Sequence, residues 1–195
     1  VGLFDVASGL RIRTLTKNGG PVYAIDFSRD GKALALVTFD ELRLWDPLAG
    51  KLLRVIATHQ EQLTALALSP DGASAVTSAR DGKLKLWDTS SGRELRAIET
   101  GTPVLWVALS PDGRTIAAPC LDGALRLYDA GTGKALKTLA GHAGIATSVA
   151  FSANGSLLAS GSVDKAVKLW DPAAGNEVRS IDLGSVVSSV TFSPD

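Results

Sequence analysis

The stretch ASGSVDKAVKLWD (residues 159–171) has the pattern of a β-hairpin. Apolar residues alternate with polar ones on both sides of Asp164, and the stretch ends in Trp170 and Asp171. Alternation of this kind, bounded by turn residues, is a strand and hairpin signal. The same pattern returns along the chain, so this stretch is one copy of a repeating unit.

The aromatic residue that ends the hairpin recurs at a nearly constant step. Trp45, Trp87, Tyr128 and Trp170 lie 42, 41 and 42 residues apart, and each is followed by an aspartate. A glycine stands four residues after each of these aspartates. A second marker keeps the same step, as SRDG at 28–31, SPDG at 69–72, SPDG at 110–113 and SANG at 152–155. Repeats of about 40 to 45 residues are typical of propeller blades.

Each unit has the pattern of four short strands, and no window has sustained helical spacing. We therefore predict an all-β fold, a β-propeller of four-stranded antiparallel blades that forms an incomplete ring or open arc. All of residues 1–195 are assigned to one propeller domain. The predicted sequence repeats cover 10–48, 51–90, 93–131 and 134–173, with partial units at 1–9 and 176–195.

The two ends of the chain fall inside repeats, which favours a piece of a longer chain. Counting strands by the repeat gives 19, of which the last lies at about 186–192. This last strand is a candidate to pair with the strands at the N-terminal end. Because exposed sheet edges promote pairing between chains, self-association through open blade edges is expected.

The unit GHAGIATSVAFSANGSLLASGSVDKAVKLWD (141–171) resembles the repeat of the WD-repeat family of β-propellers. The resemblance extends over all 195 residues. It implies a ring of blades that serves as a rigid docking surface for other macromolecules. On this basis we predict a non-enzymatic scaffold for protein–protein interaction, whose partners are other proteins.

The two histidines of the chain occupy equivalent positions, thirteen residues before the glycine of the second marker. Both units also contain a hydroxyl residue, an aspartate and a tryptophan at matching positions, which gives the sets His59, Thr77, Asp81, Trp87 and His142, Ser160, Asp164, Trp170. In the other two units the histidine and the hydroxyl are both missing, with Asn18 and Leu36 in one, and Thr100 and Ala118 in the other. This pairing predicts a buried hydrogen-bonded chain in each complete set, and the resembling family has such a tetrad.

The residue types Ser160, His142 and Asp164 also fit the nucleophile, base and orienting carboxylate of a hydrolase. However, the trio occurs twice with the structural period, each time with a tryptophan. We therefore favour the structural interpretation and predict no catalytic residues. The alternative is the propeller domain of an enzyme or of a periplasmic accessory protein, which a signal peptide upstream of Val1 would favour. A cytoplasmic location is otherwise expected.

The composition excludes several classes of partner. Lys and Arg number 20, as do Asp and Glu, so the formal net charge is zero. The chain therefore has neither the basic footprint of a nucleic-acid-binding protein nor a polybasic membrane signal. No metal-binding cluster or phosphate-binding loop stands out, and we predict no cofactor. The single cysteine, Cys120, falls in a predicted buried strand and is interpreted as a small core residue.

Four residues are candidates for contact with a partner. Arg80, Leu121 and Val163 directly precede the hairpin aspartate, where the resembling family tends to present such side chains. Trp106 stands where the other units have Ala24, Ala65, Ser148 and Ser189. It is either an exposed anchor for a partner or a filler of the space left by Thr100 and Ala118, and we favour the filler.

One basic residue recurs in the strand predicted to be outermost in each blade. The series is Arg13, Arg54, Arg96, Lys137 and Arg179. Charges on exposed edge strands oppose aggregation, and we interpret the series in this way.

Overall fold

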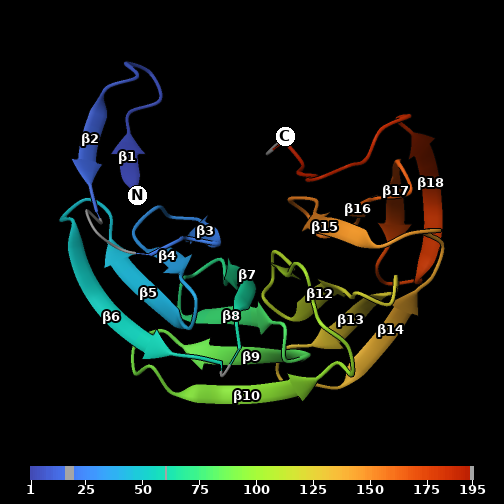
Figure 1. Ribbon diagram of the computed structural model, residues 1–195, viewed down its shortest axis with the longest axis horizontal. Coiled ribbons are helices and arrows are strands. Elements are labelled where there is room, and N and C mark those ends of the chain that lie inside the picture. The colour runs from blue at the N-terminus through green and yellow to red at the C-terminus, as the bar shows by residue number, and fades with distance from the viewer. Residues whose placement is uncertain (16–19, 60, 194–195) are drawn as a thin grey trace.

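The computed structural model describes residues 1–15, 20–59 and 61–193. It consists of antiparallel β-sheets arranged side by side as an open arc, with the two chain ends on either side of the gap (Figure 1). The predicted all-β fold of four-stranded blades in an open arc is confirmed.

The arc contains one two-stranded sheet and four complete blades. The N-terminal sheet consists of β1 (Gly2–Phe4) and β2 (Arg11–Thr14). The first blade consists of β3 (Ala24–Phe27), β4 (Leu34–Val37), β5 (Glu41–Asp46) and β6 (Lys51–Ala57). The second consists of β7 (Leu63–Leu68), β8 (Ser74–Ala79), β9 (Lys83–Asp88) and β10 (Glu94–Glu99). The third consists of β11 (Ala108–Leu109), β12 (Thr115–Pro119), β13 (Leu125–Asp129) and β14 (Ala135–Leu139). The fourth consists of β15 (Ala146–Phe151), β16 (Leu158–Ser162), β17 (Ala166–Asp171) and β18 (Asn176–Asp182).

A sequence repeat and a blade are offset by one strand. The first strand of the predicted repeat 51–90 is β6, which completes the sheet of the first blade, whereas β7, β8 and β9 belong to the second. In Figure 1 the first strands of the blades face the middle of the arc, and β6, β10, β14 and β18 form its outer rim. Each repeat therefore links two neighbouring blades through the chain itself.

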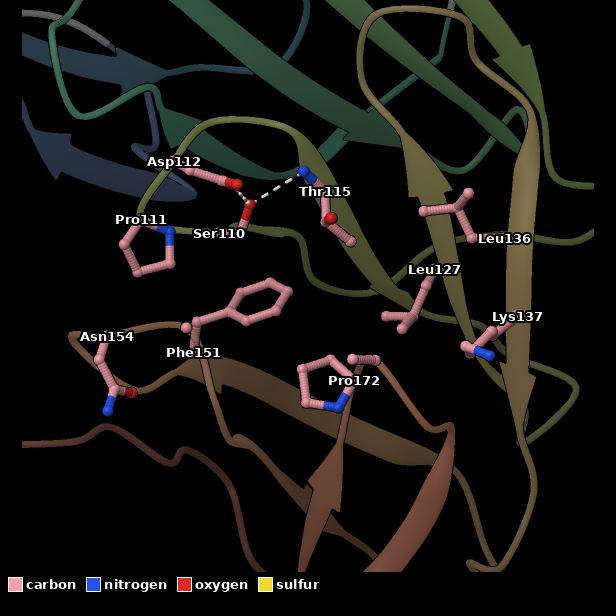
Figure 2. A pocket seen from close by; sticks show the side chains of 12 residues that line it. Ser110, Pro111, Asp112, Thr115, Leu127, Leu136, Lys137, Phe151, Asn154 and Pro172 are labelled. Atoms are coloured by element: carbon pink, nitrogen blue, oxygen red, sulfur yellow. Dashed lines mark hydrogen bonds between the residues drawn. The ribbon is translucent and has the colours of Figure 1, made fainter.

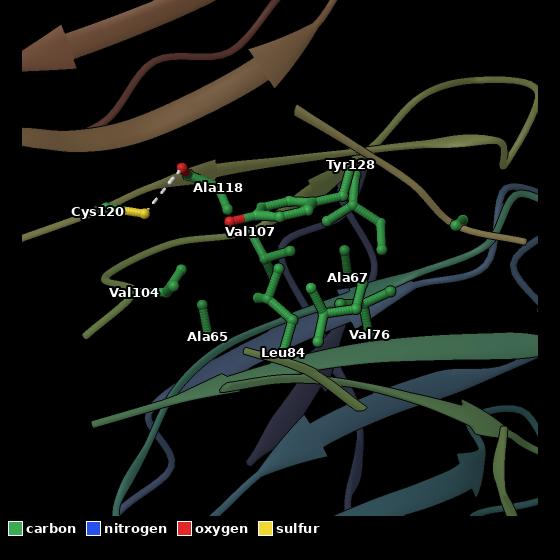
Figure 3. Packing of buried hydrophobic residues seen from close by; sticks show 12 residues of the cluster. Ala65, Ala67, Val76, Leu84, Val104, Val107, Ala118, Cys120 and Tyr128 are labelled. Carbon is green, nitrogen blue, oxygen red and sulfur yellow. Dashed lines mark hydrogen bonds between the residues drawn. The ribbon is translucent and has the colours of Figure 1, made fainter. Parts of the chain in front are cut away.

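The hydrophobic core lies mainly between neighbouring blades. Figure 3 shows the cluster between the second and third blades, where Val76 and Leu84 lie opposite Val107 and Tyr128. Cys120 belongs to this cluster and is fully buried, as predicted, and burial raises the pKa of its thiol. A blade of four strands has two apolar faces, so it is stable only when a neighbour covers each of them.

Three of the basic residues on the outer strands contact the following blade. Arg13 donates a hydrogen bond to the carbonyl oxygen of Leu48 (3.2 Å), and Arg54 donates to the carbonyl oxygens of Ser91 (3.1 Å) and Ser90. Arg96 donates to the carbonyl oxygen of Gly131 (2.5 Å). These three residues thus bind the turn before the outer strand of the following blade, a role that the sequence did not indicate. The interpretation of the series as edge charges against aggregation stays a prediction.

The repeated glycine of that turn makes the contact possible. Gly133 has a φ of 74°, a left-handed backbone conformation that favours glycine. A Cβ atom at this position would lie 2.7 Å from Cδ of Arg96. Any larger residue would strain the turn and displace the arginine from the junction.

The C-terminal segment differs from the prediction. The described residues contain 18 strands, and residues 186–192 form none of them. The segment does not pair with the N-terminal strands, which pair with one another. Instead the Val187 N–H donates to the carbonyl oxygen of Ser162 (3.1 Å), and Thr147 Oγ1 donates to that of Val187 (2.5 Å).

This segment occupies the place of the first strand of a further blade. Thr64 Oγ1 donates to the carbonyl oxygen of Val104 (2.6 Å) in the same way as Thr147 does to Val187, and both valines are buried. A strand without a neighbour in its own sheet lacks half of its ladder, which explains why 186–192 is not a regular strand. Self-association through the open ends of the arc stays a prediction.

Candidate functional site

The second and fourth blades each contain a hydrogen-bonded chain of four side chains. In the fourth blade Trp170 Nε1 lies 2.8 Å from Ser160 Oγ, which lies 2.7 Å from His142 Nε2. His142 Nδ1 lies 2.8 Å from Asp164 Oδ2. The structure thus brings together the four residues that co-occur in the sequence.

The second blade repeats this geometry. Trp87 Nε1 lies 2.9 Å from Thr77 Oγ1, which lies 3.0 Å from His59 Nε2. His59 Nδ1 lies 2.8 Å from Asp81 Oδ2. The hydroxyl oxygen accepts from the indole N–H, which is a donor only. Burial lowers the pKa of His59 and so favours the neutral imidazole, in which Nδ1–H donates to the aspartate when the hydroxyl proton is given to Nε2.

In both networks the hydroxyl is buried and already hydrogen-bonded. Thr77 and Ser160 are fully buried, and the oxygen of each already bonds to two partners. The geometry of a nucleophile, a base and an orienting carboxylate is present, but the nucleophile is not accessible. No group of three or more His, Cys, Asp or Glu side chains in the described part of the chain is placed to hold a metal ion.

The aspartate at the end of each network fixes the hairpin between the second and third strands. Asp164 accepts hydrogen bonds from the N–H groups of Ala143 (2.8 Å) and Ala166 (3.0 Å) as well as from His142. Burial of the carboxyl raises its pKa, but these hydrogen bonds outweigh that effect and hold the pKa at about 2. Asp81 likewise accepts from the Lys83 N–H (3.0 Å).

The other two blades lack this four-membered network. In the third blade Tyr128 replaces tryptophan, and Asp122 pairs with Arg126 Nη1 (3.0 Å) and Nη2 (2.5 Å) instead of a histidine. Thr100, at the histidine position, donates to the carbonyl oxygen of Gly82 (2.7 Å). In the first blade Nε1 of Trp45 is buried and has no hydrogen-bond partner among the described residues. Asn18, at the histidine position of that repeat, lies outside the described residues.

The residue before each hairpin aspartate is exposed at one end of the blades. Leu121 and Val163 are 45% and 41% exposed, and Arg80 is also exposed. The first blade adds Phe39, which is 55% exposed and which the sequence analysis did not select. The sequence could have identified Phe39, because this residue directly precedes Asp40 and lies one repeat before Arg80. These four residues, Phe39, Arg80, Leu121 and Val163, are here called the hairpin face.

The favoured interpretation of Trp106 as a buried filler is wrong. Its side chain is 36% exposed and faces a cavity beside the inner strands, whereas Ala65 and Ser148 at the equivalent positions are buried. The cause is Pro119, which stands opposite this segment where the other blades have Ser78 and Gly161. Proline has no N–H to donate to the neighbouring strand. The strand β11 is accordingly reduced to two residues, and Trp106 lies outside the regular ladder.

Acidification should destabilise the protein through His59 and Asp164. Burial lowers the pKa of His59 below its unfolded value of about 6.5. The unfolded chain therefore binds more protons than the folded one once the pH falls below about 6.5. The free energy of unfolding then decreases as the pH falls further, until the pH reaches the pKa of His59 in the folded protein. Asp164 adds a second loss between about pH 4 and pH 2.

Urea unfolding at intervals from pH 8 to pH 3 measures this dependence. The free energy of unfolding should be level above about pH 7.5 and should fall in two stages below it. A His59→Gln variant serves as the control, because it should lose the stage near pH 6 and keep the lower one. A wild-type stability that rises between pH 7 and pH 5 would contradict the argument.

Comparison with known proteins agrees with this architecture. Three segments, 50–88, 92–129 and 133–171, match the family model described as WD domain, G-beta repeat, and together make up more than half of the chain.

Among the described residues no helix is long and apolar enough to cross a membrane.

Three curated relatives match shorter stretches. An uncharacterized WD repeat-containing protein of Synechocystis sp. is 32% identical over 76 residues, which are 38% of this chain and 22% of that protein. The guanine nucleotide-binding protein subunit beta of Schizosaccharomyces pombe is 25% identical over 79 residues, 40% of this chain and 26% of that protein. The pre-rRNA-processing protein pro-1 of Caenorhabditis briggsae is 37% identical over 65 residues, 33% of this chain and 12% of that protein. The chain therefore spans about a quarter or less of the length of these relatives. The WD-domain model, in contrast, matches more than half of this chain, and the chain belongs to the WD40 repeat family.

Proposed function

We propose that this chain is a non-enzymatic scaffold that binds another protein through the hairpin face. The observation that carries the proposal is the exposure of Phe39, Leu121 and Val163 at equivalent points of three blades. Large apolar side chains gathered on one end of a fold mark interaction sites. Arg80, at the same point of the second blade, adds a residue type that is enriched in binding hot spots.

The hydrogen-bonded networks support this role because they hold the face rigid. Asp81 and Asp164 fix the backbone directly after Arg80 and Val163. A side chain that is already ordered loses less entropy when a partner binds. The networks thus favour partner binding because they hold the hairpins that carry Arg80 and Val163 in place.

A groove of about 350 Å³ lies within the hairpin face. Leu121 and Asp122 line one side of it, and His142, Ala143 and Gly144 line the other. Val163 lies against Gly144, since a Cβ atom there would be 2.7 Å from Val163 Cγ2. We place the centre of the partner's contact between Leu121 and Val163.

The test is a double substitution, Leu121→Asp and Val163→Asp. Partners are isolated with the tagged wild-type protein from its source cells, then purified, and their affinities are measured by calorimetry. The variant should bind at least about tenfold more weakly, because charges would replace two apolar contacts worth roughly 1 kcal/mol or more each.

The matched control is Leu48→Asp with Val178→Asp, which changes two apolar residues outside the hairpin face that are more exposed than Leu121 and Val163. This control should bind with the wild-type affinity. Equal affinities of the wild type and the Leu121/Val163 variant for every purified partner would refute the proposed face.

A further inference from the structure

A second groove lies at the opposite end of the blades, at the junction of the third and fourth. It has a volume of about 550 Å³. Leu136 and Phe151 provide accessible apolar surface over the buried Leu127, and Pro111 and Pro172 stand on its two sides (Figure 2). The SPDG-type turns are at this end of the second strands, and the hairpin face is at the other end. The groove is therefore separate from the proposed hairpin face.

The groove contains a cation that has no partner among the described residues. Lys137 reaches across the junction, and a Cβ atom at Gly175 would lie 2.7 Å from its Cδ. No described residue accepts a hydrogen bond from its ammonium group or forms an ion pair with it. Arg54 and Arg96, at the equivalent positions of the first and second blades, are held by backbone carbonyl oxygens.

The difference follows from the side chains. The forked guanidinium of arginine reaches two carbonyl oxygens at once, whereas an ammonium is a single point charge. The equivalent groove between the first and second blades, which contains Arg54, measures about 290 Å³. The groove that contains Lys137 is therefore larger than the one that contains Arg54, and its cation has no partner among the described residues.

The charges at the ends of the groove have opposite signs. Asp112 lies at the end away from Lys137 (Figure 2), and its carboxylate accepts from Ser110 Oγ (2.5 Å) and the Arg114 N–H (3.0 Å). An anionic ligand group is attracted to Lys137 and repelled by Asp112. The accessible apolar surface between them is contributed by Leu136 of β14, Phe151 of β15 and two rigid prolines, so it needs little ordering to bind.

We propose that this groove binds a short extended segment of a partner protein, in which an acidic side chain directly adjoins two large apolar side chains. The acidic group pairs with Lys137, and the apolar side chains rest on Leu136 and Phe151. The volume falls within the range of ligand sites, about 300–1,000 Å³, and suits a few side chains. A lone small anion would leave the apolar surface uncovered.

The probes for the test are fluorescein-labelled hexapeptides, Ser-Leu-Leu-Glu-Gly-Ser and its reversed sequence, each also made with Gln or Lys in place of Glu. Fluorescence polarisation measures binding to the whole chain. The Glu peptide of at least one chain direction should bind about tenfold tighter than its Gln counterpart and displace NMR signals of Phe151 and Lys137.

Reversal of the charge provides the decisive comparison. Lys137→Glu should lose the preference for Glu and prefer the Lys peptide, a gain that a merely structural defect would not produce. Lys134→Glu makes the same change in net charge at an exposed site outside the groove and should keep the wild-type preference. The Leu121/Val163 variant of the hairpin face should also bind the peptides as the wild type does.

Four outcomes would overturn the proposal. The first three are the absence of saturable binding by every peptide, a preference for Glu that persists in Lys137→Glu, and an equal loss in Lys134→Glu. Saturation by acetate alone with the same affinity as the Glu peptide would also overturn it, because the site would then bind a small anion. None of these outcomes bears on the hairpin face, which has its own test.

Discussion

Replacing Ser160 by alanine should lower the free energy of unfolding by about 2–4 kcal/mol. The hydroxyl serves two buried partners, since it accepts from Trp170 Nε1 and bonds to His142 Nε2. Trp170 is 1% exposed and the His142 side chain 2% exposed, so water cannot replace the lost hydroxyl. A buried polar group left without a partner costs about 1–3 kcal/mol. Urea unfolding of the two proteins at pH 7.5 measures the difference.

The control is Ser156→Ala, which removes an exposed hydroxyl that bonds only to Asn154 and should change stability by less than about 0.5 kcal/mol. The triple variant Ser160→Ala, His142→Thr, Trp170→Tyr copies the combination found in the third blade. Because it removes three of the four members of the network together, it should be more stable than the sum of its single changes indicates. Additive losses, or a Ser160→Ala loss no larger than that of the control, would show that the network is not a coupled unit.

The parts of the structure that repeat could be predicted from the sequence. The period located the strands and turns, and the joint presence or absence of histidine and hydroxyl identified the two networks before any geometry was known. This succeeded because a half-completed buried network is costly, so its members are kept or lost together. The four blades of the structure agree with this prediction.

The direction of a side chain could not be predicted in the same way. The period placed Arg54 and Arg96 on outer strands, but it did not show that they bind the turn of the following blade. That contact joins residues more than 30 positions apart, and it depends on the curvature of the arc. The sequence likewise did not indicate that Lys137, unlike Arg54 and Arg96, has no hydrogen-bond partner among the described residues.

The repeat pattern also did not indicate where the structure departs locally from the repeat. Trp106 was aligned correctly with Ala65 and Ser148, yet its exposure depends on Pro119 in the neighbouring strand. The segment 186–192 has the sequence of a strand but no second strand beside it. In both places the outcome depends on the hydrogen-bonding partner across the sheet, and a pattern along one strand does not contain that information.

Replacing Trp170 by alanine should have the largest effect, a loss of about 3–5 kcal/mol in the free energy of unfolding. The ring is almost fully buried in the cluster between the third and fourth blades, with Leu139 and Leu158 among its members. A Cβ atom at Gly141 would lie only 3.0 Å from the ring, so the site is closely packed and cannot collapse easily around a cavity. The substitution also removes the donor of the network.

Conservative changes at two tryptophans separate the packing effect from the hydrogen bond. Trp170→Phe keeps most of the ring and loses the N–H, so it should cost about 1–2 kcal/mol. Trp45→Phe should cost less than Trp170→Phe, because the buried N–H of Trp45 has no partner among the described residues and its removal relieves a desolvated donor. Thermal and urea unfolding of both variants measure the contrast. An equal loss at the two positions would mean that the hydrogen-bonded chain adds nothing to the packing of the indole ring.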